Sequence, residues 1–120
     1  MANSYTIGVS DTRPWGTWVV VDAGPGFAVK RITVAPGGVL SLQRHRYRAE
    51  CWTIVAGVAE VTLGSETFAA MAGEVVEIGL GQVHRIANHG AEPVVFIEVQ
   101  MGATLDEGDI ERLEDQYGRT

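Results

Sequence analysis

The chain has 120 residues, of which 46% are hydrophobic and 20% are charged, so it can bury one ordinary hydrophobic core without disulfide or metal staples. The formal net charge of −6 argues against a nucleic-acid partner, and no apolar run approaches the roughly eighteen residues of a membrane span. A single cysteine, Cys51, excludes an internal disulfide, and because no signal-peptide pattern opens the chain we expect one cytoplasmic domain over residues 1–120.

Short β-type segments separated by turns make up most of the chain. Residues 1–12 carry no strong period, which predicts a loose arm or a first edge strand. A valine run at 19–21 leads into a glycine- and proline-containing turn and predicts a hairpin with Phe27–Val34. Further strand-like segments follow at short, regular intervals: residues 39–45, 51–55, 59–63, 66–70, 75–78, 84–88 and 94–101. This spacing predicts an all-β sandwich or barrel.

Only the end of the chain carries helix signals. Apolar residues stand at Leu105, Ile110 and Leu113, acids come early, and Gly118 can act as a stop. The pattern predicts a short C-terminal helix that lies on the barrel. Between residues 106 and 115 there are six acids against the single base Arg112, which is −5 of the total charge of −6. The rest of the chain is therefore near neutral, which leaves room for a local basic cluster that receives an anionic substrate.

Two stretches carry side chains of metal-binding type at suggestive spacings. Gln43 and His45 are two residues apart, so on a strand they leave by the same face, and Glu50 can return to the same point from the neighbouring strand. Downstream, the glycines at 79 and 81 allow a tight turn that presents His84 at the start of another strand. Two imidazoles, one carboxylate and one amide oxygen suit one borderline divalent ion. We therefore predict a metal site formed by Gln43, His45, Glu50 and His84.

The same stretches resemble the paired motifs of the cupin superfamily. Residues 37–57 follow G-x5-H-x-H-x(3,4)-E-x6-G, and residues 73–88 follow G-x5-P-x-G-x2-H-x3-N. Two positions depart, because Gln43 stands where most cupins have the first histidine and Gly79 stands where they have proline. The resemblance implies a small antiparallel jelly-roll barrel that often dimerises. A cupin that has lost its metal is the alternative.

A Gln-x-His followed by Glu and a distant His resembles the metal set of phosphomannose isomerases. Further short matches occur in the same order as in the C-terminal isomerase domain of the type II bifunctional phosphomannose isomerase/GDP-mannose pyrophosphorylase family, at residues 13–16, 29–34, 40–43, 48–50, 84–85, 97–100 and 114–119. The resemblance covers nearly the whole chain and implies a zinc-dependent enzyme of polysaccharide biosynthesis, although Mn, Fe, Co or Ni also suit the ligands. Pyrophosphorylase activity is not expected, because the nucleotidyltransferase domain is absent from this sequence.

This family implies isomerisation of mannose 6-phosphate to fructose 6-phosphate, a proton transfer through an enediol. Lys30 and Glu98 each alternate with apolar or amide neighbours, which predicts that both point into the barrel, where a charge is costly unless it is paired or meets a substrate. Glu98 is then the candidate base, since Glu50 is a ligand. Lys30 and Arg85 are candidates for contact with phosphate or an oxyanion, and Arg85 requires a bulge to reach the mouth. The alternative is a reversed phase with Lys30 and Glu98 in solvent.

One departure from the isomerase family concerns the residues beside the metal set. Family members carry a run of histidines where this chain has His45, Arg46 and Tyr47, and only the first histidine is kept. Arg44, Arg46 and Arg48 form either a solvated strand face or a phosphate-binding series. Two other functions therefore stay open: a non-catalytic sugar-binding or sensor cupin, and a cupin dioxygenase with a redox metal.

Overall fold

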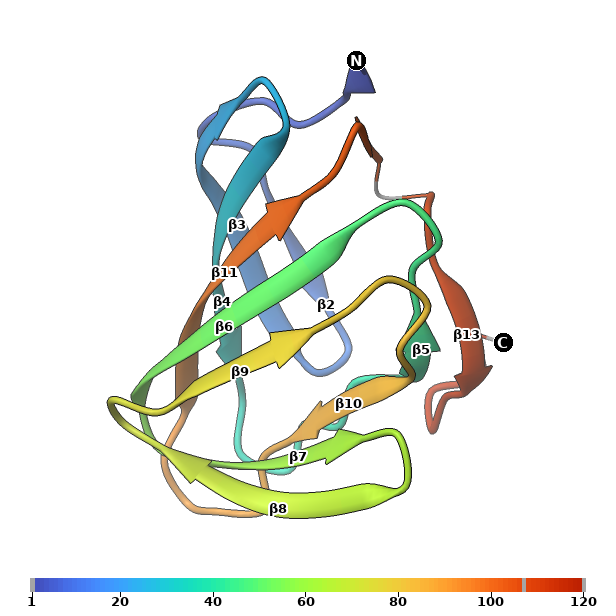
Figure 1. Ribbon diagram of the computed structural model, residues 1–120. Coiled ribbons are helices and arrows are strands. Elements are labelled where there is room, and N and C mark those ends of the chain that lie inside the picture. The colour runs from blue at the N-terminus through green and yellow to red at the C-terminus, as the bar shows by residue number, and fades with distance from the viewer. Residues whose placement is uncertain (1, 107, 120) are drawn as a thin grey trace.

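The computed structural model of the protein describes residues 2–106 and 108–119, and this part of the chain contains strands, turns and loops but no helix (Figure 1). The strands are β1 (Ala2–Asn3), β2 (Ser10–Arg13), β3 (Gly16–Gly24), β4 (Phe27–Val34), β5 (Leu42–Arg44), β6 (Ala49–Ala56), β7 (Val58–Leu63), β8 (Glu66–Met71), β9 (Val75–Ile78), β10 (His84–Ala87), β11 (Val94–Met101), β12 (Thr104–Leu105) and β13 (Glu111–Glu114). The predicted all-β class is confirmed.

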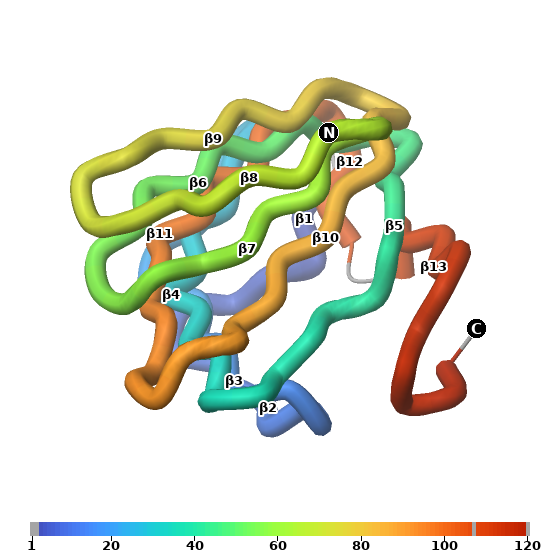
Figure 2. The backbone as a smooth tube through the Cα atoms, turned by 90° about the horizontal axis from the view of Figure 1, so that it is seen from below, coloured from blue at the N-terminus to red at the C-terminus, as the bar shows by residue number. Residues whose placement is uncertain are grey.

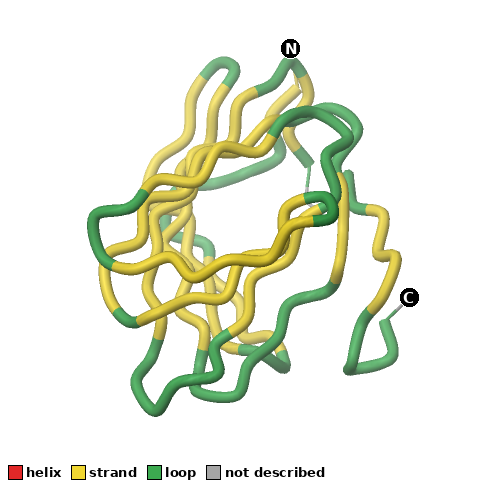
Figure 3. The backbone as a smooth tube through the Cα atoms, turned by 60° about the horizontal axis from the view of Figure 1, so that its bottom comes forward, coloured by secondary structure: helices red, strands yellow, loops and turns green. Residues whose placement is uncertain are grey.

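Two antiparallel sheets face each other and curve into a barrel (Figure 3). One sheet has the order β2-β3-β4-β11-β6-β9 and the other has the order β13-β5-β10-β7-β8. Neighbours in each sheet are mostly far apart in sequence, as in a jelly roll. A separate parallel pair, β1 with β12, ties the start of the chain to its last fifth.

Strand periodicity explains how the barrel is filled. In β4 and β11 every second residue is buried, so one face of each strand points into the barrel. The apolar core includes Trp52, Ile54, Val61, Ile86 and Phe96, each at most 2% exposed. Polar and charged side chains are buried as well: Lys30, Ser41, His45, Arg48, Glu50, His84, Asn88, Glu98 and Gln100. Such a concentration of buried polar groups marks a site rather than a packing core.

Most of the predicted segments coincide with strands. Segments 27–34, 75–78 and 94–101 have the predicted bounds as β4, β9 and β11. The predicted strand over 39–45 is shorter, because β5 covers only Leu42–Arg44 and Val39 makes an isolated bridge to Ala87. The first thirteen residues supply both β1 and the edge strand β2.

The predicted C-terminal helix is wrong. Within residues 105–113, Leu105 ends β12 and residues 111–113 belong to β13, while residue 107 lies outside the described residues. Strand β13 pairs antiparallel with β5, and Figure 2 shows the two side by side at the edge of the barrel. An isolated helix of this length is only marginally stable in water. The unpaired N–H and C=O groups at the edge of β5 offer the segment backbone hydrogen bonds, so pairing as a strand is favoured over the helix. We call residues 109–119 the C-terminal strap.

Candidate metal centre and its pocket

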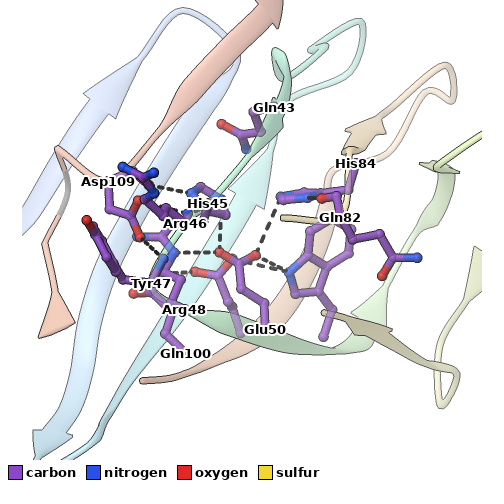
Figure 4. Close-up of polar contacts among 12 residues, drawn as sticks. Gln43, His45, Arg46, Tyr47, Arg48, Glu50, Gln82, His84, Gln100 and Asp109 are labelled. Atoms are coloured by element: carbon purple, nitrogen blue, oxygen red, sulfur yellow. Dashed lines mark hydrogen bonds and ion pairs between the residues drawn. The ribbon is translucent and has the colours of Figure 1, made fainter. Parts of the chain in front are cut away.

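Three of the four predicted ligands meet in the barrel interior (Figure 4). Glu50 Oε2 lies 3.2 Å from His45 Nε2, and Glu50 Oε1 lies 3.8 Å from His84 Nε2. The candidate ligand atoms of the three residues all lie within 4.8 Å of one another, and each residue is at most 2% exposed. Residues far apart in the chain thus converge as the sequence spacing predicts.

The local structure explains this convergence. His45 follows β5, Glu50 lies in β6 on the neighbouring sheet, and His84 opens β10. Gly81 has φ +71° in the turn before β10, and its N–H donates to the carbonyl of His45 at 2.8 Å. That conformation favours glycine, and the bond fixes the turn against the segment that carries the first histidine. The two ring centroids then lie 5.0 Å apart.

Both imidazoles are held in the tautomer that binds a metal through Nε2. His45 Nδ1 lies 2.6 Å from the carbonyl oxygen of Asp109, and His84 Nδ1 lies 2.8 Å from that of Gln82. Because a carbonyl only accepts hydrogen bonds, each Nδ1 carries the proton and each Nε2 keeps a lone pair. Burial lowers the pKa of His45 to about 4, with Arg48 adding to the shift, and burial also lowers the pKa of His84. Both rings are therefore neutral near pH 7.

His84 Nε2 provides a direct test of whether a cation fits. This atom is buried, and within the described part of the chain it makes no hydrogen bond. It lies 3.8 Å from Oε1 of the Glu50 carboxylate. An orphaned lone pair beside a second lone pair and a carboxylate is the arrangement that a divalent cation satisfies. The donor set fits a metal ion.

The fourth predicted ligand, Gln43, lies beside the group. It pairs with His84 across β5 and β10, so the two side chains leave by the same face. Its Oε1 accepts a hydrogen bond from Ser41 Oγ at 3.2 Å, and the side chain also lines the adjacent pocket. Gln43 is thus placed between the cluster and the pocket.

Arg48 was not among the predicted site residues, yet it contacts two of the ligands. Its Nε donates to Glu50 Oε2 at 2.9 Å, its Nη2 donates to His45 Nε2 at 3.2 Å, and its Nη1 donates to Tyr5 Oη at 3.0 Å. Arg48 as a residue is 6% exposed, whereas Arg44 and Arg46 are exposed. The signal was present in the sequence, because Arg48 and Glu50 are two residues apart and share a strand face.

Glu98 and Lys30 both point into the barrel, which confirms the predicted phase. Glu98 is 5% exposed; its Oε1 accepts from Trp52 Nε1 at 3.2 Å and its Oε2 accepts from Gln100 Nε2 at 2.8 Å. Burial, and then the neighbouring Glu50 carboxylate, raise the pKa of Glu98 to about 7. Lys30 lies opposite Glu98 on β4 and is 3% exposed.

The Lys30 ammonium sits between two aromatic rings. Nζ lies 4.1 Å from the ring centroid of Trp18 and 4.6 Å from that of Tyr5. Cation–π contacts of this kind stabilise a buried ammonium without neutralising its charge. The two rings therefore hold the end of the Lys30 side chain at the wall of the barrel.

Arg85 is not brought to the cluster. It follows His84 on a strand that pairs with β7 residue by residue, so no bulge turns it inward. Its Nε donates to the carbonyl of Leu40 at 2.9 Å, and its Nη1 and Nη2 reach the side chain and carbonyl of Glu114 at 3.3 Å. Arg85 fastens the C-terminal strap to the outside of the barrel.

A pocket of about 60 Å³ opens beside the cluster. Its wall includes Gln43, Glu98 and Arg48, and Arg48 contacts His45 and Glu50 of the candidate metal centre. The other lining residues are Arg13, Trp15, Trp18, Lys30, Ile32, Leu40, Ser41, Ile110, Arg112 and Arg119. Among the described lining residues Glu98 is the one carboxylate, against five cationic side chains. Sequence reasoning missed Arg112 and Arg119 because it assigned the acidic C-terminal segment to a surface helix.

Comparisons with known proteins agree with this description. Residues 2–115 match the family model described as mannose-6-phosphate isomerase C-terminal. The chain is 53% identical over 108 residues to the alginate biosynthesis protein AlgA of Pseudomonas aeruginosa, covering 90% of this chain and 22% of that protein. It is 48% identical over 107 residues to the mannose-1-phosphate guanylyltransferase ManC of Salmonella typhimurium, covering 89% and 22%. The chain thus spans about a fifth of the length of these curated relatives.

A solved structure supports the fold assignment. A protein with a double-stranded β-helix domain from Klebsiella pneumoniae superposes with a TM-score of 0.71 at 26% identity, covering 81% of this chain and 83% of that chain. The double-stranded β-helix is the cupin architecture, so the expected cupin fold is confirmed. Among the described residues no helix has the length and apolar character needed to span a membrane.

Proposed function

The chain belongs to the family of mannose-6-phosphate isomerase C-terminal domains, and on that basis we propose that it is a metal-dependent sugar-phosphate isomerase that interconverts mannose 6-phosphate and fructose 6-phosphate. The observation that carries this proposal is the pairing of a buried metal-type cluster with a second buried carboxylate, Glu98, on the wall of a cationic pocket. The relative named for alginate biosynthesis supports a role in polysaccharide precursor supply.

The metal would be held by His45, Glu50 and His84, with Gln43 as the fourth protein donor. A bound divalent ion would act as a Lewis acid toward the carbonyl and neighbouring hydroxyl of the sugar. The resemblance to the isomerase family favours zinc, and Mn, Fe, Co and Ni suit the same nitrogen and oxygen donors. Burial of every charged donor keeps water away from the reacting end of the sugar.

Glu98 is assigned the proton transfer between C2 and C1. It lines the pocket, it is not needed as a ligand, and a pKa of about 7 lets it take up and return a proton near neutral pH. Trp52 and Gln100 each hold one of its oxygens, so the carboxylate cannot rotate away from the pocket. This fixed orientation is what a base needs in order to reach one carbon and then its neighbour.

Lys30 is assigned the stabilisation of negative charge on the substrate. Its side chain is buried and lies opposite Glu98 in the strand register. A fixed cation beside the base favours an enediolate over a neutral sugar, which is a transition-state effect rather than uniform binding. Arg85 receives no catalytic role, because its guanidinium is engaged by Glu114 and Leu40 on the outer face.

The proposal is limited to one cytoplasmic cupin domain and to the isomerase step, because the matched region is about a fifth of each relative. A second candidate is a non-catalytic cupin that binds sugar phosphates. One observation favours it: Arg48 already contacts both His45 Nε2 and Glu50 Oε2, so the cluster is partly satisfied by an internal cation.

A coupled isomerase assay separates the two candidates. Protein loaded in turn with Zn, Mn, Co and Ni should convert mannose 6-phosphate to fructose 6-phosphate, and chelation should abolish turnover reversibly. Metal content per chain, measured by mass spectrometry, gives the matching stoichiometry. Binding of mannose 6-phosphate without turnover for any of these metals would reject the isomerase and favour the binding protein.

A further inference from the structure

Arg48 contacts two of the candidate metal ligands at the atoms that would bind the ion (Figure 4). Its Nε donates to Glu50 Oε2 at 2.9 Å, and its Nη2 donates to His45 Nε2 at 3.2 Å. The two acceptor atoms lie 3.2 Å from each other. One guanidinium group therefore bridges a nitrogen and an oxygen that both belong to the candidate metal centre.

The contact at His45 excludes a metal ion at the same atom. The Asp109 carbonyl lies 2.6 Å from His45 Nδ1 and keeps the ring proton there, so Nε2 has a single lone pair. This lone pair can accept from Arg48 or bind an ion, but it cannot do both. Glu50 differs, because a carboxylate offers about four lone-pair positions and can accept from Arg48 Nε while it binds a cation elsewhere.

Arg48 also competes through its charge. A guanidinium group does not lose its proton in proteins. The side chains of Arg48 and Glu50 are 7% and 1% exposed, so solvent and salt screen the charge of Arg48 only weakly at this place. An ion bound to Glu50 would meet a second cation at close range, which lowers the affinity of the site for that ion.

Contacts on the far side hold the guanidinium group in this position. Arg48 Nη1 donates to Tyr5 Oη at 3.0 Å and to the carbonyl of Asp106 at 3.5 Å. Tyr5 precedes β2 and Asp106 follows β12, so segments near the two ends of the chain fix Arg48. Arg48 also lines the pocket, which gives Nη2 a direction in which to turn when it leaves His45.

We propose that Arg48 is an internal competitor of the metal ion. Metal binding at His45 requires Arg48 Nη2 to leave that nitrogen, while Nε keeps its bond to Glu50. The released Nη2 turns into the pocket, where an oxygen of a bound ligand accepts its hydrogen bond. The competition needs only the candidate metal centre. The cooperation between metal and ligand rests on the proposed function, since the ligand is taken to be a sugar phosphate.

The test compares the zinc affinities of the wild type, Arg48→Met and Arg46→Met as full chains. Affinity is measured by competition with a chromophoric chelator at one fixed pH. Arg48→Met should bind zinc about tenfold or more tightly than the wild type, because neither the His45 lone pair nor the Glu50 charge is engaged by a cation. Arg46 is exposed, and its replacement removes the same charge but should change the affinity by less than about twofold.

The sign of the effect decides the question. If Arg48 only supported its neighbours as ligands, its removal would lower zinc affinity by about 10- to 100-fold. A lower or unchanged zinc affinity in Arg48→Met would therefore overturn the proposal. Equal gains in Arg48→Met and Arg46→Met would show a general charge effect and would also overturn it.

Tyr5→Phe guards against a folding defect in Arg48→Met, which leaves the buried Glu50 carboxylate without its partner. Phenylalanine keeps the ring that contacts Lys30 Nζ at 4.6 Å but lacks the hydroxyl that accepts from Arg48. A less firmly held Arg48 competes less well, so zinc affinity should rise by about threefold. If Arg48→Met does not fold, an unchanged or lower zinc affinity in Tyr5→Phe rejects the proposal.

Zinc affinity measured again with saturating mannose 6-phosphate tests the cooperation. The wild type should gain affinity, and by linkage zinc should raise the affinity for the sugar phosphate by the same factor. The gain should be at least about threefold smaller in Arg48→Met, which has no donor to release. Equal gains would overturn the cooperation. If mannose 6-phosphate does not bind, the proposed function and the cooperation both fail, while the zinc comparison still decides the competition.

Discussion

Glu98→Gln is the sharpest test of the proposed base, because the protein can accept this change without losing its fold. In the wild-type protein, Oε1 accepts from Trp52 and Oε2 accepts from Gln100 Nε2 at 2.8 Å. In the variant an NH₂ group would face the Gln100 NH₂ group. Gln100 Oε1, however, is buried and has no donor within the described residues, so a flip of the Gln100 amide restores an acceptor at this place.

The expected loss concerns chemistry rather than stability. A positioned general base contributes about 10²- to 10⁴-fold to the rate, which is about 3–5 kcal/mol of activation free energy. The wild-type activity should rise with pH as Glu98 deprotonates. Burial and the Glu50 carboxylate raise the pKa of Glu98 to about 7, and a cation bound to Glu50 offsets the second cause, so the acid limb should lie at or below about pH 7. The limb should vanish in Glu98→Gln.

The assay measures kcat and KM across pH 5–9 for the wild type, Glu98→Gln and Glu77→Gln. Glu77 is an exposed carboxylate on β9 and controls for the loss of one negative charge. Metal content and the thermal midpoint are recorded for each protein. The reasoning fails if Glu98→Gln, with a full complement of metal, keeps more than about a tenth of the wild-type kcat, or if its acid limb persists.

Three further predictions concern the metal centre and the strap. His84→Ala should lower the affinity for metal by at least about a hundredfold, measured by metal titration. The control His89→Ala, at a surface histidine, should leave this affinity unchanged. Equal losses of affinity in the two variants would refute the ligand assignment. Asp115→Asn should destabilise the strap by about 1 kcal/mol, read as faster hydrogen exchange at 110–119, because Asp115 anchors Arg119. Arg119 lowers the pKa of Asp115 to about 2, so this stabilisation is present above about pH 4 and is lost as pH falls toward 2. Burial lowers the pKa of His45 to about 4, so between pH 6.5 and pH 4 this histidine is protonated in the unfolded chain but not in the folded one. The free energy of unfolding of the metal-free protein, measured with urea, should therefore fall by on the order of 1.4 kcal/mol for each unit that the pH is lowered in this range. An unfolding free energy that does not change with pH would contradict this.

The barrel was predictable because its signals are local. In β4, β9 and β11 the alternation of buried and exposed residues starts and stops at turn residues, so strand bounds followed from sequence. The metal cluster was predictable from motif spacing, since His45 and Glu50 flank one short connection and His84 opens a strand directly after a turn that contains Gly81. By contrast, the prediction for Arg85 required a bulge that would turn its side chain to the same face as that of the preceding residue, His84. The pairing of β10 with β7 is regular, so the Arg85 side chain lies on the outside of the barrel.

The strap was not predictable from local pattern. Leu105, Ile110 and Leu113 fit a helical spacing, and the surrounding acids fit a helix start, but the competing partner for this segment is the free edge of β5, more than sixty residues away in the chain. Once paired there, Ile110 and Arg112 follow the strand period and both face the pocket. The alternation expected of a strand was present in this segment, but no feature of the local sequence favoured a strand over a helix.

The strap contacts both the candidate metal centre and the pocket. The carbonyl of Asp109 accepts from His45 Nδ1, and the Asp109 carboxylate accepts from the N–H groups of Arg46 and Tyr47, each at 2.9 Å. Three residues later Arg112 reaches the pocket. The same segment therefore sets the tautomer of one metal ligand and forms part of the pocket wall. Its ion pairs with Arg44 and Arg85 are partly exposed and each contributes at most about 1 kcal/mol, so a substitution that loosens the strap should also loosen the orientation of His45.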